Sequence, residues 1–208
     1  ALAEDAPDEP TAGESPVEVS NYEELVEAMD EAEDGDTIGI AGKIMLPPNI
    51  TLGYAVKHLT LQRVEAEGCT GFEVETADDS SEIDVMNITF DGGNLSSTDS
   101  IFISKQNIAF YDTNFINCLS TGGGAINVRS GDVLFKDCSF NDNTASLGGH
   151  LYMESGILNI KNCTFTNGQA THNGGAIRIG GSTVCTISNS TIYNNTAKNQ
   201  GGGIWSAG

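Results

Sequence analysis

The chain has 208 residues and a formal net charge of −20, because 29 Asp and Glu residues oppose only 9 Lys and Arg residues. Like charges repel, so this balance argues against nucleic acid and against anionic membrane surfaces as partners. Charged residues make up only 18 % of the chain and 25 residues are glycine, which is typical of short strands joined by turns and not of a helical protein.

The N-terminal part divides into a tail and a helix. Residues 1–19 are small, acidic and proline-bearing, which predicts a disordered acidic linker or tail. Residues 20–36 contain the one good helix, with Ser20 and Glu23 at capping-box spacing and Gly35 at its end. Its apolar face comprises Tyr22, Leu25, Val26 and Met29. We expect this helix to cap the end of the domain that follows, residues 20–208.

A repeat of about 25 residues dominates the rest of the chain. Five copies of a short apolar motif end at Phe90, Phe115, Phe140, Phe165 and Ile192, at spacings of 25, 25, 25 and 27 residues. A second marker follows the glycine pairs at Ile126, Leu151, Ile177 and Ile204, at spacings of 25, 26 and 27 residues. Residues 38–74 show the same alternation less regularly.

Apolar residues alternate within each repeat, which indicates three short half-buried strands per turn. The predicted fold is therefore all-β, a right-handed parallel β-helix solenoid of about seven coils with an N-terminal capping helix. Equivalent residues of successive coils should stack about 4.8 Å apart, with the Phe90–Ile192 set as the inner ladder. The last coil is incomplete, so we expect the C-terminal end to be truncated.

Five cysteines occur, an odd number without a CxxC pair, which disfavours a metal knuckle or a disulfide framework. Cys138 and Cys163 fall next to each other in one inner ladder, and Cys185 falls in another with Leu158. Buried free thiols are favoured over a Cys138–Cys163 disulfide. The remaining two are Cys69 and Cys118.

Glycine pairs recur at Gly123, Gly148, Gly174 and Gly201. A phosphate-binding turn would place a helix N-terminus after the glycines, whereas a strand pattern follows each pair. The pairs are therefore interpreted as corners at which the coils approach closely.

The repeats resemble the GGAI and FxxN repeats of the chlamydial polymorphic outer membrane proteins. Gly123–Ile126 and Gly174–Ile177 match GGAI, Gly148–Leu151 and Gly201–Ile204 match it loosely, and Phe140–Asn143 matches FxxN. The segment "ELVEAMDEAEDGDTIGI" is also similar to the opening coil of pectate-lyase-like β-helices. The resemblance covers roughly residues 20–208. It implies a displayed passenger region with a role in adhesion.

The sequence shows no catalytic constellation. We follow one row of residues predicted to point outward on each of three strands, and no two carboxylates are expected to be neighbours on any of these faces. Asp78, Asp79, Glu82 and Asp84 cluster in sequence, but a solvated turn is favoured over a calcium site. The three histidines, His58, His150 and His172, fall in different coils. We therefore expect no catalytic residue, no cofactor and no metal.

One outward row offers a candidate ligand surface. Arg178 is predicted to lie near Tyr152 and Trp205, and aromatic faces with a planar guanidinium suit glycans. A chance surface trio is the competing interpretation.

The expected function is that of a secreted or surface-displayed β-helix, extracellular or at the cell surface, which binds a host protein or glycan as adhesins do or serves as a structural stalk. The alternative is part of a polysaccharide-active lyase or hydrolase with catalytic coils beyond residue 208. Six Asn-x-Ser/Thr sequons hint at secretion. No apolar run approaches the roughly 20 residues that span a bilayer, so direct membrane insertion is not expected.

Overall fold

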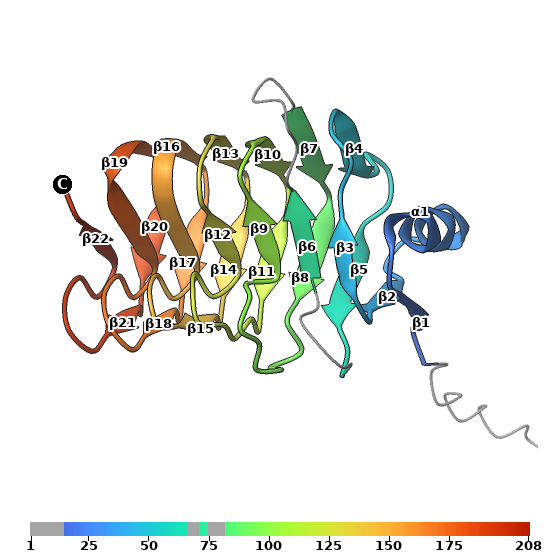
Figure 1. Ribbon diagram of the computed structural model, residues 1–208, viewed down its shortest axis with the longest axis horizontal. Coiled ribbons are helices and arrows are strands. Elements are labelled where there is room, and N and C mark those ends of the chain that lie inside the picture. The colour runs from blue at the N-terminus through green and yellow to red at the C-terminus, as the bar shows by residue number, and fades with distance from the viewer. Residues whose placement is uncertain (1–14, 66–70, 75–81) are drawn as a thin grey trace, which may run out of the picture.

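The computed structural model describes residues 15–65, 71–74 and 82–208, and Figure 1 shows them wound into a solenoid. The chain makes about seven turns, and strands of neighbouring turns pair in parallel. Among the residues that the structure describes, strands account for 52 % and helix for 6 %. The predicted all-β parallel β-helix is therefore confirmed, and Cys69, Asp78 and Asp79 lie outside the described residues.

The strands form three sheets that run along the solenoid axis. Sheet one comprises β1 (Val17–Val19), β2 (Thr37–Ile40), β5 (Leu59–Arg63), β8 (Ile88–Asp91), β11 (Asn114–Ile116), β14 (Ser139–Asn141), β17 (Thr164–Thr166) and β20 (Thr191–Tyr193). Sheet two comprises β3 (Lys43–Met45), β4 (Ile50–Gly53), β6 (Gly71–Val74), β7 (Glu82–Met86), β9 (Phe102–Ser104), β10 (Asn107–Tyr111), β12 (Ile126–Val128), β13 (Asp132–Lys136), β16 (Leu151–Lys161), β19 (Ile177–Ser188) and β22 (Ile204–Ser206). Sheet three comprises β15 (Thr144–Ala145), β18 (Gln169–Ala170) and β21 (Thr196–Ala197).

Sheet two bends around the solenoid and so supplies two of the predicted strands in each coil. In the coils before β16 these two strands are separate, as β12 and β13 are. Strands β16 and β19 are longer, and each one covers the positions of both strands. Sheet three was not predicted, because its two-residue strands are too short to show a pattern of alternation.

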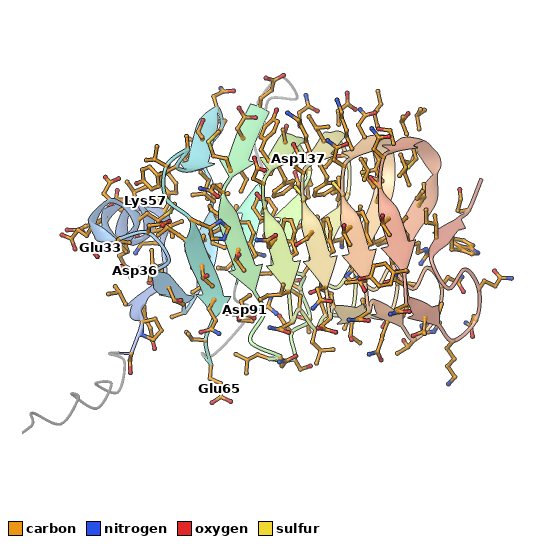
Figure 2. All side chains as sticks on the ribbon, turned by 180° about the vertical axis from the view of Figure 1, so that it is seen from behind. Glu33, Asp36, Lys57, Glu65, Asp91 and Asp137 are labelled. Carbon is orange, nitrogen blue, oxygen red and sulfur yellow. The ribbon has the colours of Figure 1, made fainter. Side chains whose placement is uncertain are left out.

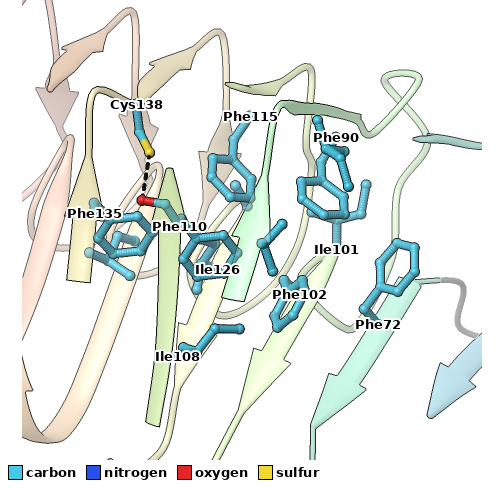
Figure 3. Packing of buried hydrophobic residues seen from close by; sticks show 14 of the residues in the cluster. Phe72, Phe90, Ile101, Phe102, Ile108, Phe110, Phe115, Ile126, Phe135 and Cys138 are labelled. Atoms are coloured by element: carbon cyan, nitrogen blue, oxygen red, sulfur yellow. Dashed lines mark hydrogen bonds between the residues drawn. The ribbon is translucent and has the colours of Figure 1, made fainter. Parts of the chain in front are cut away.

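Stacked phenylalanines fill the core, as Figure 3 shows. The predicted ladder is confirmed, since Phe90, Phe115, Phe140, Phe165 and Ile192 are successive register partners. Rings of Phe115 and Phe140 stack with centroids 4.8 Å apart, and those of Phe140 and Phe165 with centroids 4.4 Å apart. The four phenylalanines have no exposed surface. Offset stacking of buried rings adds to the hydrophobic free energy that each ring gains by burial.

The predicted cysteine ladders are also confirmed. Leu158 and Cys185 are register partners, and Cys138 and Cys163 lie next to each other in the core. The four cysteines that the structure describes are free. Burial raises the pKa of the Cys118 thiol to about 12, so this thiol stays protonated and behaves as a small apolar group.

The glycine pairs lie at the corners between sheets three and two. A Cβ atom on Gly124 would overlap the carbonyl oxygen of Gly149, and one on Gly149 would overlap that of Gly175. The same relation holds between Gly175 and Gly202 in the next coils. Backbones of successive coils therefore approach too closely for a side chain, which agrees with the interpretation of these pairs as corners.

Asparagine and aspartate occupy the other corners. Among the described residues, every non-glycine with positive φ is one of these two types. They are Asn49, Asn87, Asn94, Asp112, Asn117, Asp137, Asp142, Asn162, Asn167, Asn189 and Asn194. All six sequon asparagines are in this set. Corner geometry alone accounts for asparagine at these positions, so the sequons carry no argument for secretion.

Helix α1 (Tyr22–Glu31) lies at the N-terminal end of the solenoid, where Leu25 and Met29 are buried against the core. The predicted boundaries were wrong by a few residues. The N-cap is Asn21, whose side chain accepts from the Glu24 backbone N–H, and Glu24 reaches back to Ser20. The helix ends at Glu31, before the predicted 20–36 segment does.

Strand β1 lies inside the segment predicted as a disordered tail. Val17, Glu18 and Val19 pair with Ile38, Gly39 and Ile40 of β2, and Val19 is buried. This three-residue strand was not predicted, because the residues around it are acidic and polar. Within the described residues, no helix has the length and apolar character needed to cross a membrane.

Candidate functional site

The described residues contain no cluster of three or more His, Cys, Asp or Glu that could hold a metal ion. Each histidine has its own surroundings. The His58 ring nitrogens contact Asn87 Oδ1 at 2.9 Å and Thr89 Oγ1 at 2.7 Å, and His172 is exposed. His150 is fully buried.

The buried His150 joins two inward-pointing asparagines. Its Nδ1 accepts from Asn143 Nδ2 at 2.9 Å, which assigns the proton to Nε2 and directs that N–H to Asn195 Oδ1 at 3.0 Å. Asn143 Oδ1 accepts from the Cys118 backbone N–H, and Asn195 Oδ1 accepts from that of Gly168. The asparagine of the FxxN motif therefore satisfies backbone groups of the preceding coil, and its role is structural.

Tyr152, Arg178 and Trp205 meet on the outer face of β16, β19 and β22. They are successive register partners. The guanidinium carbon of Arg178 lies 4.8 Å from the centroid of the Tyr152 ring and 5.0 Å from that of Trp205. The predicted proximity is therefore confirmed, while the role of this trio in ligand binding stays a prediction.

Contacts within this trio occupy part of each side chain. One face of each ring already covers the guanidinium, and Trp205 Nε1 donates to Gln200 Oε1 at 2.9 Å. Arg178 Nε is buried without a hydrogen-bond partner, although the three residues are each partly exposed. Because the guanidinium lies between rings from the two neighbouring coils, the arrangement favours a role for Arg178 in joining those coils.

A second surface lies over β7, β10, β13 and β16, on the other half of sheet two. Here a groove of about 260 Å³ is lined by carboxylates, amides and one tyrosine over a partly apolar floor. Its lining includes Glu82, Asp84, Asn107, Ala109, Tyr111, Asp132, Leu134 and Asn159. We call this the acidic groove, since none of the residues lining it is Lys, Arg or His.

The sequence interpretation of Glu82 and Asp84 as part of a solvated turn was wrong, since both lie on β7. They are two residues apart on one strand, so their side chains share a face. Asp132 pairs with Asn107 one coil away, and Asn107 pairs with Glu82. The statement that no two carboxylates are neighbours therefore does not hold for this face.

Hydrogen bonds between coils fix the polar groups of the acidic groove. The backbone N–H of Asp132 donates to Asn107 Oδ1 at 2.9 Å, and that of Ile157 donates to Asp132 Oδ1 at 3.2 Å. Burial raises the pKa of the Tyr111 phenol, and the carboxylates of Asp84 and Glu82 raise it further. Tyr111 thus stays protonated and presents its O–H beside acceptors.

The acidic groove was missed because only one outward row of these strands was considered. That row contains Asp84, Ala109, Leu134 and Asn159, whereas Glu82 and Asp132 lie two residues earlier along the same strands. A signal was present in the sequence, since Asn107 precedes Asp132 by the repeat length of 25 residues.

Comparison of the chain with protein families, with curated proteins and with solved structures finds no match in any of the three.

Proposed function

We propose that the chain is a non-catalytic, surface-displayed β-helix that binds a neutral glycan, in the manner of an adhesin, in the acidic groove. The observation that carries the proposal is the lining of this groove, which combines three carboxylates, two amides and a tyrosine with an alanine and a leucine. Recognition sites for small polar ligands have this mixture of apolar floor and few polar groups.

The chemistry of the groove suits sugar hydroxyls. Hydroxyl groups donate charge-assisted hydrogen bonds to carboxylates, and amides both donate to and accept from hydroxyls. Ala109 and Leu134 lie between the polar residues and supply a floor for the C–H face of a pyranose ring. Acidic glycans are disfavoured because three carboxylates and the net charge of −20 repel them.

The test uses binding to an array of neutral oligosaccharides, followed by titration calorimetry on the best ligand. We expect Ala109→Tyr, which fills the groove, and Tyr111→Ser, which removes its aromatic ring, each to weaken binding at least about tenfold. Thr191→Tyr and Tyr193→Ser are the matched controls, because both positions are exposed on β20 of sheet one. Equal affinity of the groove variants and the wild type would refute the proposal, and absence of any ligand would favour a structural stalk.

A second candidate is supported by the three carboxylates themselves. Glycoside hydrolysis uses a pair of carboxyl groups on either side of the scissile bond, and Glu82, Asp84 and Asp132 share one groove. The chain would then be part of a polysaccharide-active lyase or hydrolase in which carboxylates of the acidic groove take part in catalysis. Release of reducing ends or unsaturated products from the bound oligosaccharide would favour this candidate over pure binding.

A further inference from the structure

One side of α1 and the neighbouring coil form a partly apolar surface at the N-terminal end of the solenoid. Val26, at the border of the helix face that buries Leu25 and Met29, is 37 % exposed, and Met45 at the end of β3 is 48 % exposed. Two depressions, of about 530 and 540 Å³, meet at Tyr22 and Glu23. One runs along the helix past Val26, and the other runs past Met45 to Pro48. We call this surface the cap groove.

Carboxylates line the cap groove. Glu23, Glu27, Asp30 and Glu31 lie along it, and none of its lining residues is Lys, Arg or His. Asp30 accepts a hydrogen bond from the Tyr54 hydroxyl, whereas Glu23, Glu27 and Glu31 are exposed at the helix surface. The cap groove is therefore an apolar strip with a negatively charged border.

Charge decides which occupant fits this surface. Residues 1–14 carry five acidic side chains and no basic one, so the chain's own N-terminal segment is repelled. A second copy would bring the same carboxylates of two chains together, because a symmetric contact joins identical surfaces.

We infer that the cap groove binds a cationic amphipathic peptide segment of another protein. Apolar side chains of that segment lie over Val26 and Met45, and its Lys or Arg residues face Glu23, Glu27 and Glu31. Peptides bind in this way when an apolar stripe fills a groove and flanking charges set orientation and association rate. The surface is distinct from the acidic groove, which lies on β7, β10, β13 and β16.

The test measures fluorescence anisotropy with a labelled peptide of about 14 residues made of Leu and Lys. The Leu residues are spaced so that they lie on one face of a helix, and the Lys residues lie on the other face. A shuffled peptide of identical composition is the control for charge alone. We expect the amphipathic peptide to bind at least about tenfold more tightly than the shuffled one. In amide NMR spectra of the protein, the chemical-shift changes that this peptide causes should fall in α1 and in the segment around Met45. Equal binding of both peptides, or shifts confined to the acidic groove, would overturn the inference.

Variants separate the apolar and charged contributions. We expect Val26→Ser with Met45→Ser, and separately Glu27→Gln with Glu31→Gln, to weaken peptide binding by about tenfold. The controls are Val184→Ser, which changes a residue 66 % exposed on β19, and Glu65→Gln with Glu154→Gln, which removes two other exposed carboxylates. An equal loss in the controls would show non-specific attraction and refute the inference. Neutral glycan binding should be unchanged in all of them, so the two proposals fail independently.

Discussion

At the scale of single residues, His150 shows how the repeat tolerates an irregular coil. The inward asparagine of the FxxN pattern occurs at Asn143 and Asn195, but the coil between them has Gly168. A Cβ atom on Gly168 would lie 2.5 Å from Nε2 of His150. The histidine ring thus fills the space of the missing asparagine, and glycine is required beside it.

His150 should make stability depend on pH. Burial lowers its pKa from 6.5 to about 4, although the Asn195 hydrogen bond opposes this effect. In the unfolded chain this histidine is protonated as the pH falls below about 6.5, whereas in the folded chain it is protonated only near pH 4. The folded state therefore binds fewer protons between these two values, and its stability decreases as the pH falls through this interval. The total loss is roughly 3 kcal/mol, since each pKa unit corresponds to about 1.4 kcal/mol.

Urea unfolding at several pH values between 4 and 7 tests this prediction. Carboxylates add their own pH dependence, so the informative quantity is the difference between the wild type and His150→Gln. Gln keeps polar atoms at the site without titrating, and we expect its unfolding free energy to fall less steeply as pH decreases. His172→Gln, at an exposed position, should follow the wild-type curve. Parallel curves for the wild type and His150→Gln would contradict the pKa assignment.

At the scale of elements, α1 is held by residues far away in the sequence. The Lys57 ammonium donates to the carbonyl oxygen of Met29 at 2.6 Å and to that of Ala32 at 2.8 Å. Tyr54 donates to Asp30, and burial with this bond raises the pKa of Tyr54 to about 12. Figure 2 shows Lys57 beside the helix. A cation at the helix C-terminus also interacts favourably with the helix dipole.

Lys57→Met should destabilise the cap. The apolar stem is retained, but the last carbonyl groups of α1 lose their donor, which costs about 1–2 kcal/mol. Thermal unfolding and amide hydrogen exchange of Leu25 and Met29 are the measurements. Lys198→Met, at an exposed position in the last coils, is the matched control. Unchanged exchange in α1 would mean that Lys57 does not hold the helix end.

The same elements show what sequence can and cannot predict here. The ladders through Phe140 and Cys163 were predictable, because each inward position recurs at the repeat length and faces its own copy. The end of α1 was not, because Lys57 belongs to a later coil. The acidic groove depends on which outward rows share one face and on the small Ala109 between larger neighbours, so it required the three-dimensional structure.

At the scale of the whole molecule, charge is concentrated at one end. Among the described residues, 15–36 carry nine acidic side chains and no basic one, and α1 lies at the N-terminal end of the solenoid. Figure 2 shows two acids of later coils on opposite sides of sheet one, Asp91 at the end of β8 and Asp137 between β13 and β14. Mutual repulsion should therefore weaken the cap more than the coils.

Salt should stabilise the protein, and the cap most of all. Raising sodium chloride from about 10 to about 300 mM shortens the Debye length and screens the repulsion, so we expect a higher Tm. Hydrogen exchange should slow more in α1 than in β16. The variant with Glu27→Gln and Glu31→Gln removes part of the repulsion and should respond less to salt. A Tm independent of salt in the wild type would contradict this account.

Stacking coil on coil also determines how the domain carries mechanical force. The first and last described strands, β1 and β22, lie at opposite ends of the solenoid, and strands pair only between neighbouring coils. A force that pulls the two ends apart therefore acts along the hydrogen bonds between strands. Each set of hydrogen bonds between two neighbouring coils carries the full force, one set after another. Each coil that peels off releases about 25 residues, or roughly 80 Å of extended chain. Anchored at one end and bound at the other, the protein would lengthen stepwise under tension.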